Sequence, residues 1–436
     1  MKIACVNTAD RGGGTESLAV DLNKQFLDLG HESILLVGRK EGSDSDILEI
    51  PSSINPFSTA TPARSFPEAV QKISRLHILL NKIERLLGFE EFIHPVSSHI
   101  LRLVPFKPDV LVFHNLHCKY FDLRALKKLS RKIPCVLILH DRWLLTGHCA
   151  QPLGCTRWKS GCGHCPDLSI YPSIRRDATA FNWRRKKRVY ERSLLYLAAP
   201  SQWQLEQVHE SMLSGRKCRV IPNAVDMNVF KPGSREEARK RLNLPTEAQI
   251  IIFTAHSEFK DFETMLEAAR QTLQNSRGIE QMFICLGRGG AEHRERGGSI
   301  RFPGFIRDTQ QLACYYRAAD IYLHAAHDET FGKSITEAMA CGIPVIATKT
   351  GGIPEQVTHG LNGLLTAPGD SSAMAHMISQ LLEDPAMRAS MGASAHESAQ
   401  KYTFANQAAG FIEWFSEVID DWCSLRPSHG KLRRKT

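Results

Sequence analysis

The stretch DIYLHAAHDETFGKSITEAMACGIPVIATKTGGIPEQV, residues 320–357, predicts a strand, a helix and a second strand. Asp320–Ala325 and Pro344–Thr348 are short and apolar, as buried parallel strands are. Apolar residues at helical spacing indicate the helix between them, namely Ile335, Ala338 and Met339. Gly342 then ends the helix as a C-terminal cap. The polar loop before the helix therefore lies at the carboxyl end of a strand, where open α/β sheets bind ligands.

Two carboxylates bracket this helix, Glu329 before it and Glu337 inside it. At the helical rise of about 1.5 Å per residue they stand on the order of 10 Å apart, too far for an acid–base pair on one bond. This spacing suits the two ends of an extended ligand, because a buried carboxylate can hold a ribose or hexose by charge-assisted hydrogen bonds. Free backbone N–H groups after Phe331 and Gly332 favour an anion, particularly a diphosphate. Taken alone, both glutamates could equally be surface charges.

The run E-T-F-G-K-S-I-T-E-A-M-A-C-G, followed by a GG-x-PE loop, resembles the signature of the retaining glycosyltransferases of family 4. The resemblance implies a nucleotide-sugar donor whose ribose binds Glu337, with Glu329 near the transferred sugar. It also implies that backbone amides of Phe331, Gly332 and Lys333 contact the donor phosphates.

The length of 436 residues predicts two domains, each able to bury its own core. No apolar run approaches the ~20 residues of a transmembrane helix, and the amino terminus lacks a signal-peptide pattern, so we expect a cytoplasmic protein. The net charge of +9 is concentrated in residues 183–192 and 431–435. Such runs are usually solvated surface; the alternative is a patch for anionic lipid at the inner face of the cytoplasmic membrane. Nucleic acid is not expected as a partner, since no recognition motif is found.

A glycine loop containing Gly13 and Gly14 follows the first predicted strand, Lys2–Thr8. Glycines at a strand-to-helix turn allow a ligand to approach the backbone closely, although a tight turn alone also requires them. No G-x-G-x-x-G pattern fits, which makes an NAD oxidoreductase the least favoured class. The loop resembles the GG-x-E loop of the family, and this implies contact of both glycines with donor phosphates.

Histidines follow two successive predicted strands of the first half, His114 and His117 after one and His140 after the next. The carboxyl ends of adjacent parallel strands meet where substrates bind. A lone histidine is more often structural. The His140-Asp141 pair resembles the family's HD motif, which implies that His140 contacts the transferred sugar and that Asp141 orients it.

Lys260 precedes a predicted helix, Asp261–Gln274, where its ammonium group can meet phosphate oxygens. It resembles the lysine of the family's G-R-x(n)-K-G element, although the arginine and glycine of that element are missing here. The resemblance implies that Lys260 neutralises the donor diphosphate, alone or together with Arg288 or Lys333.

Four cysteines lie close together in the sequence, Cys149, Cys155, Cys162 and Cys165. In a reducing compartment this cluster favours a tetrahedral thiolate metal site over disulfides. The spacing leaves a structural zinc and metal-free packed thiols equally open. A catalytic metal is disfavoured, because four thiolates leave no open coordination position. The surrounding block resembles a subgroup of the family that acts in bacterial exopolysaccharide assembly, colanic-acid enzymes among them.

Together these features predict an α/β fold of the GT-B type, with two facing Rossmann-like domains. We expect residues 1–219 to form the acceptor-side domain, residues 220–403 to form the nucleotide-sugar-binding domain, and residues 404–436 to return to the first. The resemblance implies sugar transfer with retention to a lipid-linked or oligosaccharide acceptor in cell-surface polysaccharide biosynthesis. It implies His140, Glu329 and Lys260 as catalytic residues and no catalytic metal. The alternatives are a non-catalytic sugar-nucleotide-binding regulator and a nucleotide-sugar epimerase.

Overall fold

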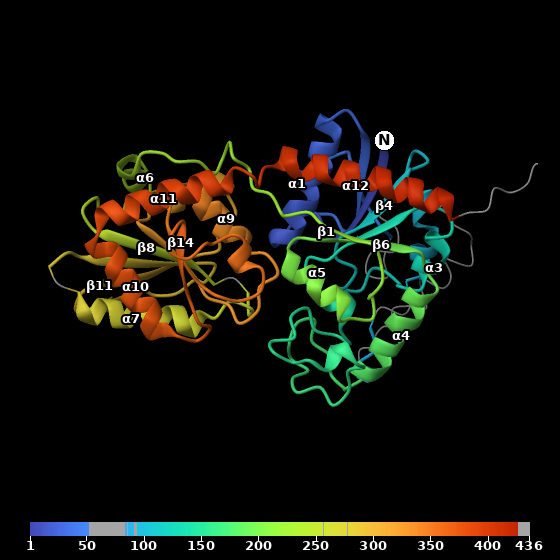
Figure 1. Cartoon of the computed structure of the whole chain (residues 1–436), viewed down its shortest axis with the longest axis horizontal. Coiled ribbons are helices and arrows are strands. Elements are labelled where there is room, and N and C mark those ends of the chain that lie inside the picture. Colours follow the sequence, from blue (N-terminus) through green and yellow to red (C-terminus); the bar gives the residue numbers. More distant parts are fainter. Residues whose placement is uncertain (52–82, 85, 91–93, 256, 277, 426–436) are drawn as a thin grey trace, which may run out of the picture.

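The computed structural model describes residues 1–51, 83–84, 86–90, 94–255, 257–276 and 278–425. These residues form two α/β halves, each built on a seven-stranded sheet (Figure 1). The basic tail at 431–435 lies outside the described residues. Among the described helices, none combines the length and apolar character needed to cross a bilayer.

The first sheet has the strand order β3-β2-β1-β4-β5-β6-β7, and each neighbouring pair is parallel. Its strands are β1 (Lys2–Ala9), β2 (Glu32–Arg39), β3 (Ile47–Glu49), β4 (Val110–Phe113), β5 (Cys135–Ile138), β6 (Leu195–Ala199) and β7 (Cys218–Val220). The strand order reverses between β1 and β4, and such a switch point is where open α/β sheets bind ligands. The predicted domain boundary at residues 219–220 falls within β7.

The described helices of this half connect and cover the strands. They are α1 (Gly14–Asp28), η2 (Pro95–Arg102), α3 (Ala125–Leu129), η3 (Trp143–Leu145), η4 (Arg157–Lys159), α4 (Thr179–Glu191) and α5 (Gln202–His209). With layers on both faces of the sheet, successive residues of a central strand are buried, as Ile3–Val6 of β1 are.

The second sheet has the order β10-β11-β9-β8-β12-β13-β14 and is parallel except for the β10–β11 pair. Its strands are β8 (Gln249–Thr254), β9 (Gln281–Leu286), β10 (His293–Glu295), β11 (Gly298–Gly304), β12 (Ile321–His324), β13 (Val345–Thr348) and β14 (Gly363–Thr366). The helices are α6 (Arg235–Arg241), α7 (Phe262–Asn275), α8 (Thr309–Ala318), α9 (Lys333–Ala340), α10 (Ser371–Glu383) and α11 (Pro385–Ala399), with the short η5 (Ile353–Glu355).

The predicted strand, helix and strand of residues 320–357 are confirmed as β12, α9 and β13. Gly342 follows the last turn of α9 with φ +76°, a left-handed conformation that glycine adopts without strain. Because the loop between β12 and α9 directly follows a strand, it lies at the carboxyl edge of the second sheet.

The basic segment 183–192 is not uniformly solvated surface. Arg184, Lys187 and Arg188 of α4 are exposed, as expected. Lys186 is fully buried instead: its Nζ lies 3.5 Å from the centre of the Trp143 ring and 3.4 Å from Glu90 Oε2. Residue order alone did not reveal that one face of this basic helix points into the protein.

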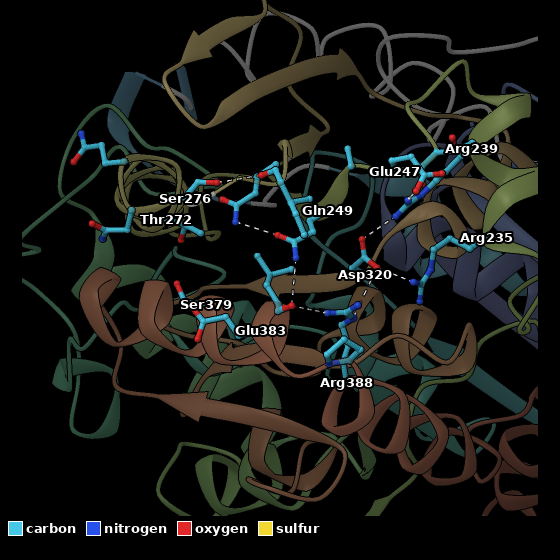
Figure 2. Close-up of a pocket in the computed structure, with 18 of the residues that line it drawn as sticks. Arg235, Arg239, Glu247, Gln249, Thr272, Ser276, Asp320, Ser379, Glu383 and Arg388 are labelled. Atoms are coloured by element: carbon cyan, nitrogen blue, oxygen red, sulfur yellow. Dashed lines mark hydrogen bonds and ion pairs between the residues drawn. The ribbon is translucent and has the colours of Figure 1, made fainter.

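A large polar cavity of about 1020 Å³ lies at the amino edge of the second sheet (Figure 2). Asp320 is a buried carboxylate in its lining, held by Arg235 and Arg239 at 2.8 Å each and by the backbone N–H of Ile250 at 2.8 Å. Because Asp320 precedes β12, this ion-pair cluster lies at the opposite end of the strand from the loop that carries Glu329.

The last helix, α12 (Phe404–Ser424), returns to the first half of the chain (Figure 1). The Trp414 Nε1 group donates to the carbonyl of Leu197 in β6 at 3.1 Å, and the Trp422 Nε1 group donates to the carbonyl of Ser130 at 2.8 Å. The ring of Phe415 packs on that of Phe26 in α1, with centroids 5.8 Å apart. The second half of the sequence therefore supplies part of the core of the first.

Replacing Trp414 by alanine should lower the free energy of unfolding of the first half by about 3–5 kcal/mol, because a buried indole and its hydrogen bond are lost. Urea denaturation followed by circular dichroism measures this change. The matched control is Ser416→Ala, an exposed position on the same helix. A loss below about 1 kcal/mol for Trp414→Ala would contradict a structural role for α12 in the first half.

Candidate functional site

The loop between β12 and α9 places a buried ionic cluster at the carboxyl edge of the second sheet. Lys260 Nζ lies 2.5 Å from Glu329 Oε2 and 3.0 Å from His324 Nε2. His324 Nε2 in turn lies 3.2 Å from the same Glu329 oxygen. Lys260 comes from the turn before α7, His324 from the end of β12 and Glu329 from the loop, so the fold joins three separate segments here.

Glu329 is held as a carboxylate in this cluster. Burial by itself raises its pKa, but the charge of Lys260 and the contacts with His324 outweigh burial and lower the pKa far below the ordinary value. A fixed negative charge beside a fixed ammonium group is thereby presented at the sheet edge. Such preorganised charges can stabilise charge that develops during a reaction.

Glu337 lies inside α9 in a different environment. Its Oε2 accepts a hydrogen bond from the Tyr316 hydroxyl at 3.1 Å, and its Oε1 lies 4.0 Å from Lys333 Nζ. Burial raises the pKa of Glu337, while Lys333 and Tyr316 lower it in part. An oxygen close to an ammonium group and a phenol can accept hydrogen bonds from ligand hydroxyls.

The GG-x-PE loop fits closely against the loop that carries Glu329. Gly351 has φ +56°, and a Cβ at this position would lie 1.9 Å from the carbonyl oxygen of Glu329. The N–H of Gly352 donates to that same carbonyl at 2.9 Å. Any side chain at Gly351 would therefore displace the backbone of Glu329.

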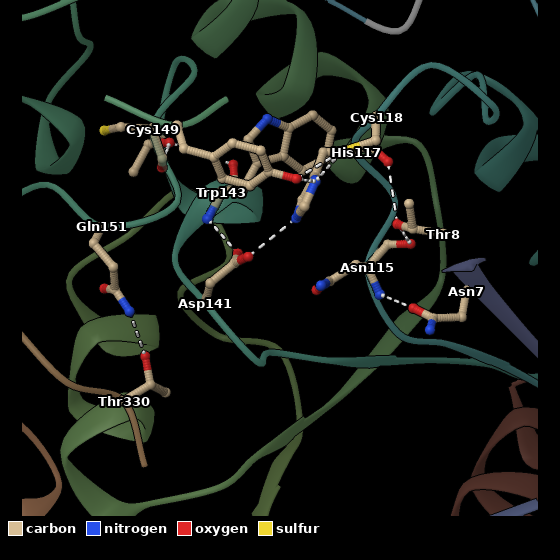
Figure 3. A network of polar contacts seen from close by, with 12 residues as sticks. Asn7, Thr8, Asn115, His117, Cys118, Asp141, Trp143, Cys149, Gln151 and Thr330 are labelled. Atoms are coloured by element: carbon tan, nitrogen blue, oxygen red, sulfur yellow. Dashed lines mark hydrogen bonds and ion pairs between the residues drawn. The ribbon is translucent and has the colours of Figure 1, made fainter. Parts of the chain in front are cut away.

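The first half of the chain also holds the loop of Glu329. Gln151 Nε2 donates to Thr330 Oγ1 at 3.1 Å, as Figure 3 shows, and the Ser201 hydroxyl donates to the carbonyl of Thr330 at 2.9 Å. Arg142 forms a buried ion pair with Asp328. These contacts join the carboxyl edges of the two sheets around one loop.

The glycine loop of the first half faces the start of α9. Gly13 is the N-cap of α1, and its N–H donates to Glu16 Oε2 at 2.9 Å, while Gly14 begins the helix. Lys333 Nζ donates to the Ser17 hydroxyl of α1 at 3.0 Å, which brings the two helix starts together. Gly332 is the N-cap of α9, and the ring of Phe331 packs edge-on against Tyr402.

His140 lies with a second histidine on the side of the first half. Its ring stacks on that of His114 with centroids 5.1 Å apart, and His140 Nε2 lies 2.9 Å from His114 Nδ1. Burial, with a smaller opposing effect of Asp141, lowers the pKa of His140 to about 4. The His140 imidazole is therefore neutral at pH 7 and can offer a hydrogen bond without adding charge.

The predicted phosphate contact Arg288 packs on an aromatic ring. Its guanidinium carbon lies 4.1 Å from the centre of the Phe262 ring, and both side chains line a cavity of about 420 Å³ with Phe302. Lys260 and Lys333, by contrast, lie directly at the two glutamates. The structure therefore groups these two lysines with the carboxylates and places Arg288 at an adjoining aromatic pocket.

The cysteine cluster is brought together around one small pocket. Cys149, Cys155, Cys162 and Cys165 line it together with His148. Across the described ranges, no group of three or more His, Cys, Asp or Glu side chains is arranged to hold a metal ion. Burial raises the pKa of Cys149 to about 12 and that of Cys162 to about 11. The structural zinc at these four cysteines stays a prediction.

Sequence reasoning missed two side chains that hold the predicted residues in place. His324 is part of an apolar strand in the sequence, which suggested a core residue. In the structure it contacts both Lys260 and Glu329. Tyr316 lies on α8 and resembles ordinary core, yet it donates to Glu337. A polar residue at the last position of an apolar strand was the available signal for His324.

The sequence and the fold of this chain are similar to those of known glycosyltransferases. Residues 12–229, half of the chain, match the family described as Glycosyltransferase Family 4, and residues 234–398 match Glycosyl transferases group 1. The architecture is similar to that of Anabaena HepE in complex with UDP-glucose, with a TM-score of 0.62 and 20% sequence identity over 96% of this chain and 100% of that one. The two facing α/β halves define a GT-B fold.

The chain belongs to glycosyltransferase family 4. It is 29% identical over 220 residues to a D-inositol 3-phosphate glycosyltransferase of Thermobispora bispora, an alignment that covers 46% of this chain and 50% of that protein. The chain thus spans about half the length of the first curated relatives it matches. A longer alignment at 26% identity covers 80% of this chain and 83% of the putative colanic acid biosynthesis glycosyl transferase WcaC of Escherichia coli.

Replacing Lys260 by methionine should lower the free energy of unfolding of the second half by about 3–5 kcal/mol, because it leaves the buried Glu329 carboxylate undercompensated. Urea denaturation measures the loss. The double variant Lys260→Met/Glu329→Gln is the matched control and should recover most of the loss, since its buried groups are neutral. Equal loss in the single and double variants would contradict the coupling of these two charges.

Proposed function

We propose that this protein transfers a sugar from a nucleotide-sugar donor to an acceptor, with retention of the anomeric configuration. The observation that carries the proposal is the ionic cluster of Lys260, Glu329 and His324 at the carboxyl edge of the second sheet, on a loop that the first half holds. A donor bound there has its sugar between the two halves and its nucleotide on the second.

The donor would lie along α9. Glu337 would accept hydrogen bonds from the ribose hydroxyls, and the diphosphate would lie at the start of α9 near Lys333, opposite Gly13 and Gly14. HepE, which shares the fold, was solved with UDP-glucose, and this supports a nucleotide-sugar as the ligand class. The neutral imidazole of His140 would contact the transferred sugar from the other half.

The leaving diphosphate is the group whose charge grows as the glycosidic bond breaks. Lys260 and Lys333 would stabilise that charge, and fixed donors of this kind can each contribute on the order of 3 kcal/mol. Glu329, paired with Lys260, would face the sugar rather than attack it. The departing phosphate would itself take the proton of the acceptor hydroxyl, so the proposal needs no carboxylate nucleophile.

The acceptor would be a lipid-linked oligosaccharide of a cell-surface polysaccharide. The alignment with the putative colanic acid biosynthesis enzyme over most of both chains supports a role in polysaccharide biosynthesis. The exposed basic residues Arg184, Lys187 and Arg188 of α4 could approach anionic headgroups of the inner membrane face from the cytoplasm.

Thermal unfolding in the presence of a panel of nucleotide-sugars and nucleoside diphosphates tests the ligand class. A ligand that binds the folded protein at 100 times its Kd adds about 2.7 kcal/mol to the free energy of unfolding, so at least one member should raise Tm. Product analysis with that donor then separates transfer from epimerisation, and donor hydrolysis separates an enzyme from a binding regulator. No stabilisation by any member of the panel would contradict the proposal.

Replacing Glu337 by alanine should weaken nucleoside diphosphate binding by about 1.5–3 kcal/mol, because a charge-assisted hydrogen bond to the ribose is lost. Isothermal titration calorimetry measures the affinity. Tyr316→Phe is the matched control, since it removes the hydroxyl that contacts Glu337 but keeps the carboxylate, and it should change binding less. Unchanged affinity in Glu337→Ala would rule out the ribose contact.

A further inference from the structure

A second polar network is formed by residues that follow the carboxyl ends of β4 and β5, the same two strands that His114 and His140 follow. In Figure 3, His117 lies between Asp141 and Cys118. His117 Nε2 is 3.1 Å from Asp141 Oδ2, and His117 Nδ1 is 3.0 Å from the Cys118 sulfur. The hydroxyl of Tyr171 lies 2.8 Å from that sulfur as well. A carboxylate, an imidazole and a thiol are thus in contact in that order.

The surrounding residues hold this network in one geometry. The His117 ring is 4% exposed and packs edge-on against Trp143 and Tyr171, with centroids 5.5 Å away in each case. Asp141 is fixed by the backbone N–H of Trp143, which donates to its Oδ1 at 2.8 Å. Neither ring nitrogen of His117 can leave its partner without disturbing this packing.

The backbone around the thiol is strained. Cys118 has φ +78° and Lys119 has φ +68°, a left-handed conformation that is unfavourable for a residue other than glycine. Strain of this kind persists where the surrounding structure requires it, and it is concentrated at functional sites. Here it directs a half-buried sulfur toward the imidazole instead of into the core.

The contacts in the network favour a cationic imidazole at His117. Burial lowers the pKa of His117, but the hydrogen bonds to Asp141 and Cys118 outweigh burial and raise it to about 10. The same contacts outweigh burial at Asp141 and lower its pKa. A cationic imidazole beside a sulfur stabilises the thiolate, which is the nucleophilic form of cysteine.

We propose that Cys118, oriented by His117 and Asp141, is a modification site for small hydroperoxides. The thiolate sulfur attacks one peroxide oxygen, an S–O bond forms and the O–O bond breaks. The sulfur is oxidised to a sulfenic acid, and the peroxide is reduced to an alkoxide or hydroxide that takes a proton from the imidazolium. Buried thiols such as Cys5, whose pKa burial raises to about 12, lack such a partner arrangement and should stay unreactive.

The position of the thiol connects its oxidation to the sugar site. Asp141, the partner of His117, is the direct neighbour of His140 in the sequence. The backbone N–H of Tyr171, whose hydroxyl meets the sulfur, donates to Glu258 of the second half at 2.7 Å. An added oxygen on Cys118 therefore disturbs contacts that reach both halves of the protein.

The test compares two thiols within the native full-length chain. Equimolar hydrogen peroxide is added, sulfenic acid is trapped with dimedone, and the rate of adduct formation is measured by peptide mass spectrometry. Cys423, exposed on α12, is the internal control. Cys118 should react at least about tenfold faster than Cys423 in the native protein and at an equal rate in urea. Equal rates in the native protein would overturn the proposal.

Two variants test whether the faster reaction of Cys118 with peroxide depends on this network. In His117→Asn, which cannot carry the cationic charge, the rate at Cys118 should fall to that of Cys423, with folding checked by circular dichroism. A wild-type rate in a folded His117→Asn protein would overturn the role of His117. Cys118→Ser should lose the adduct at this position and keep the slow reaction at Cys423. These readouts need no transferase activity, so their failure is distinct from failure of the proposed function.

Discussion

The burial of one carboxylate constrains much of the site. Glu329 lies on a loop that leaves the sheet edge, and a buried negative charge is costly unless cations and hydrogen bonds compensate it. Lys260 and His324 supply this compensation from two other segments. The position of the loop, the start of α7 and the end of β12 therefore depend on one another. The same arrangement leaves fixed charges at the carboxyl edge of the sheet, where a phosphorylated ligand would meet them.

The loop is also the point at which the two halves are held together. Thr330 accepts hydrogen bonds from Gln151 and Ser201 of the first half. Gly351 of the second half leaves space for the backbone of Glu329 only because it lacks a side chain. A change in the orientation of the two halves must therefore move the residue beside Glu329.

Local patterns allowed most of the fold to be predicted from the sequence. The apolar runs and Gly342 indicated β12, α9 and β13, because their structure depends on nearby residues. The role of His324 and the burial of Lys186 were missed, since each depends on residues far away in the chain. The spacing of the four cysteines predicted that they lie close together. It could not predict whether they bind a metal ion, because packed thiols without metal can have the same spacing.

The proposed function requires the nucleotide of the donor to lie on α9, at the carboxyl edge of the second sheet. A crystal structure with the nucleoside diphosphate that stabilises the protein tests this most directly. The ribose hydroxyls should contact Glu337, and the diphosphate should lie between Lys333 and the glycine loop of the first half. A nucleotide bound instead in the cavity around Asp320, at the opposite edge of the sheet, would contradict this placement.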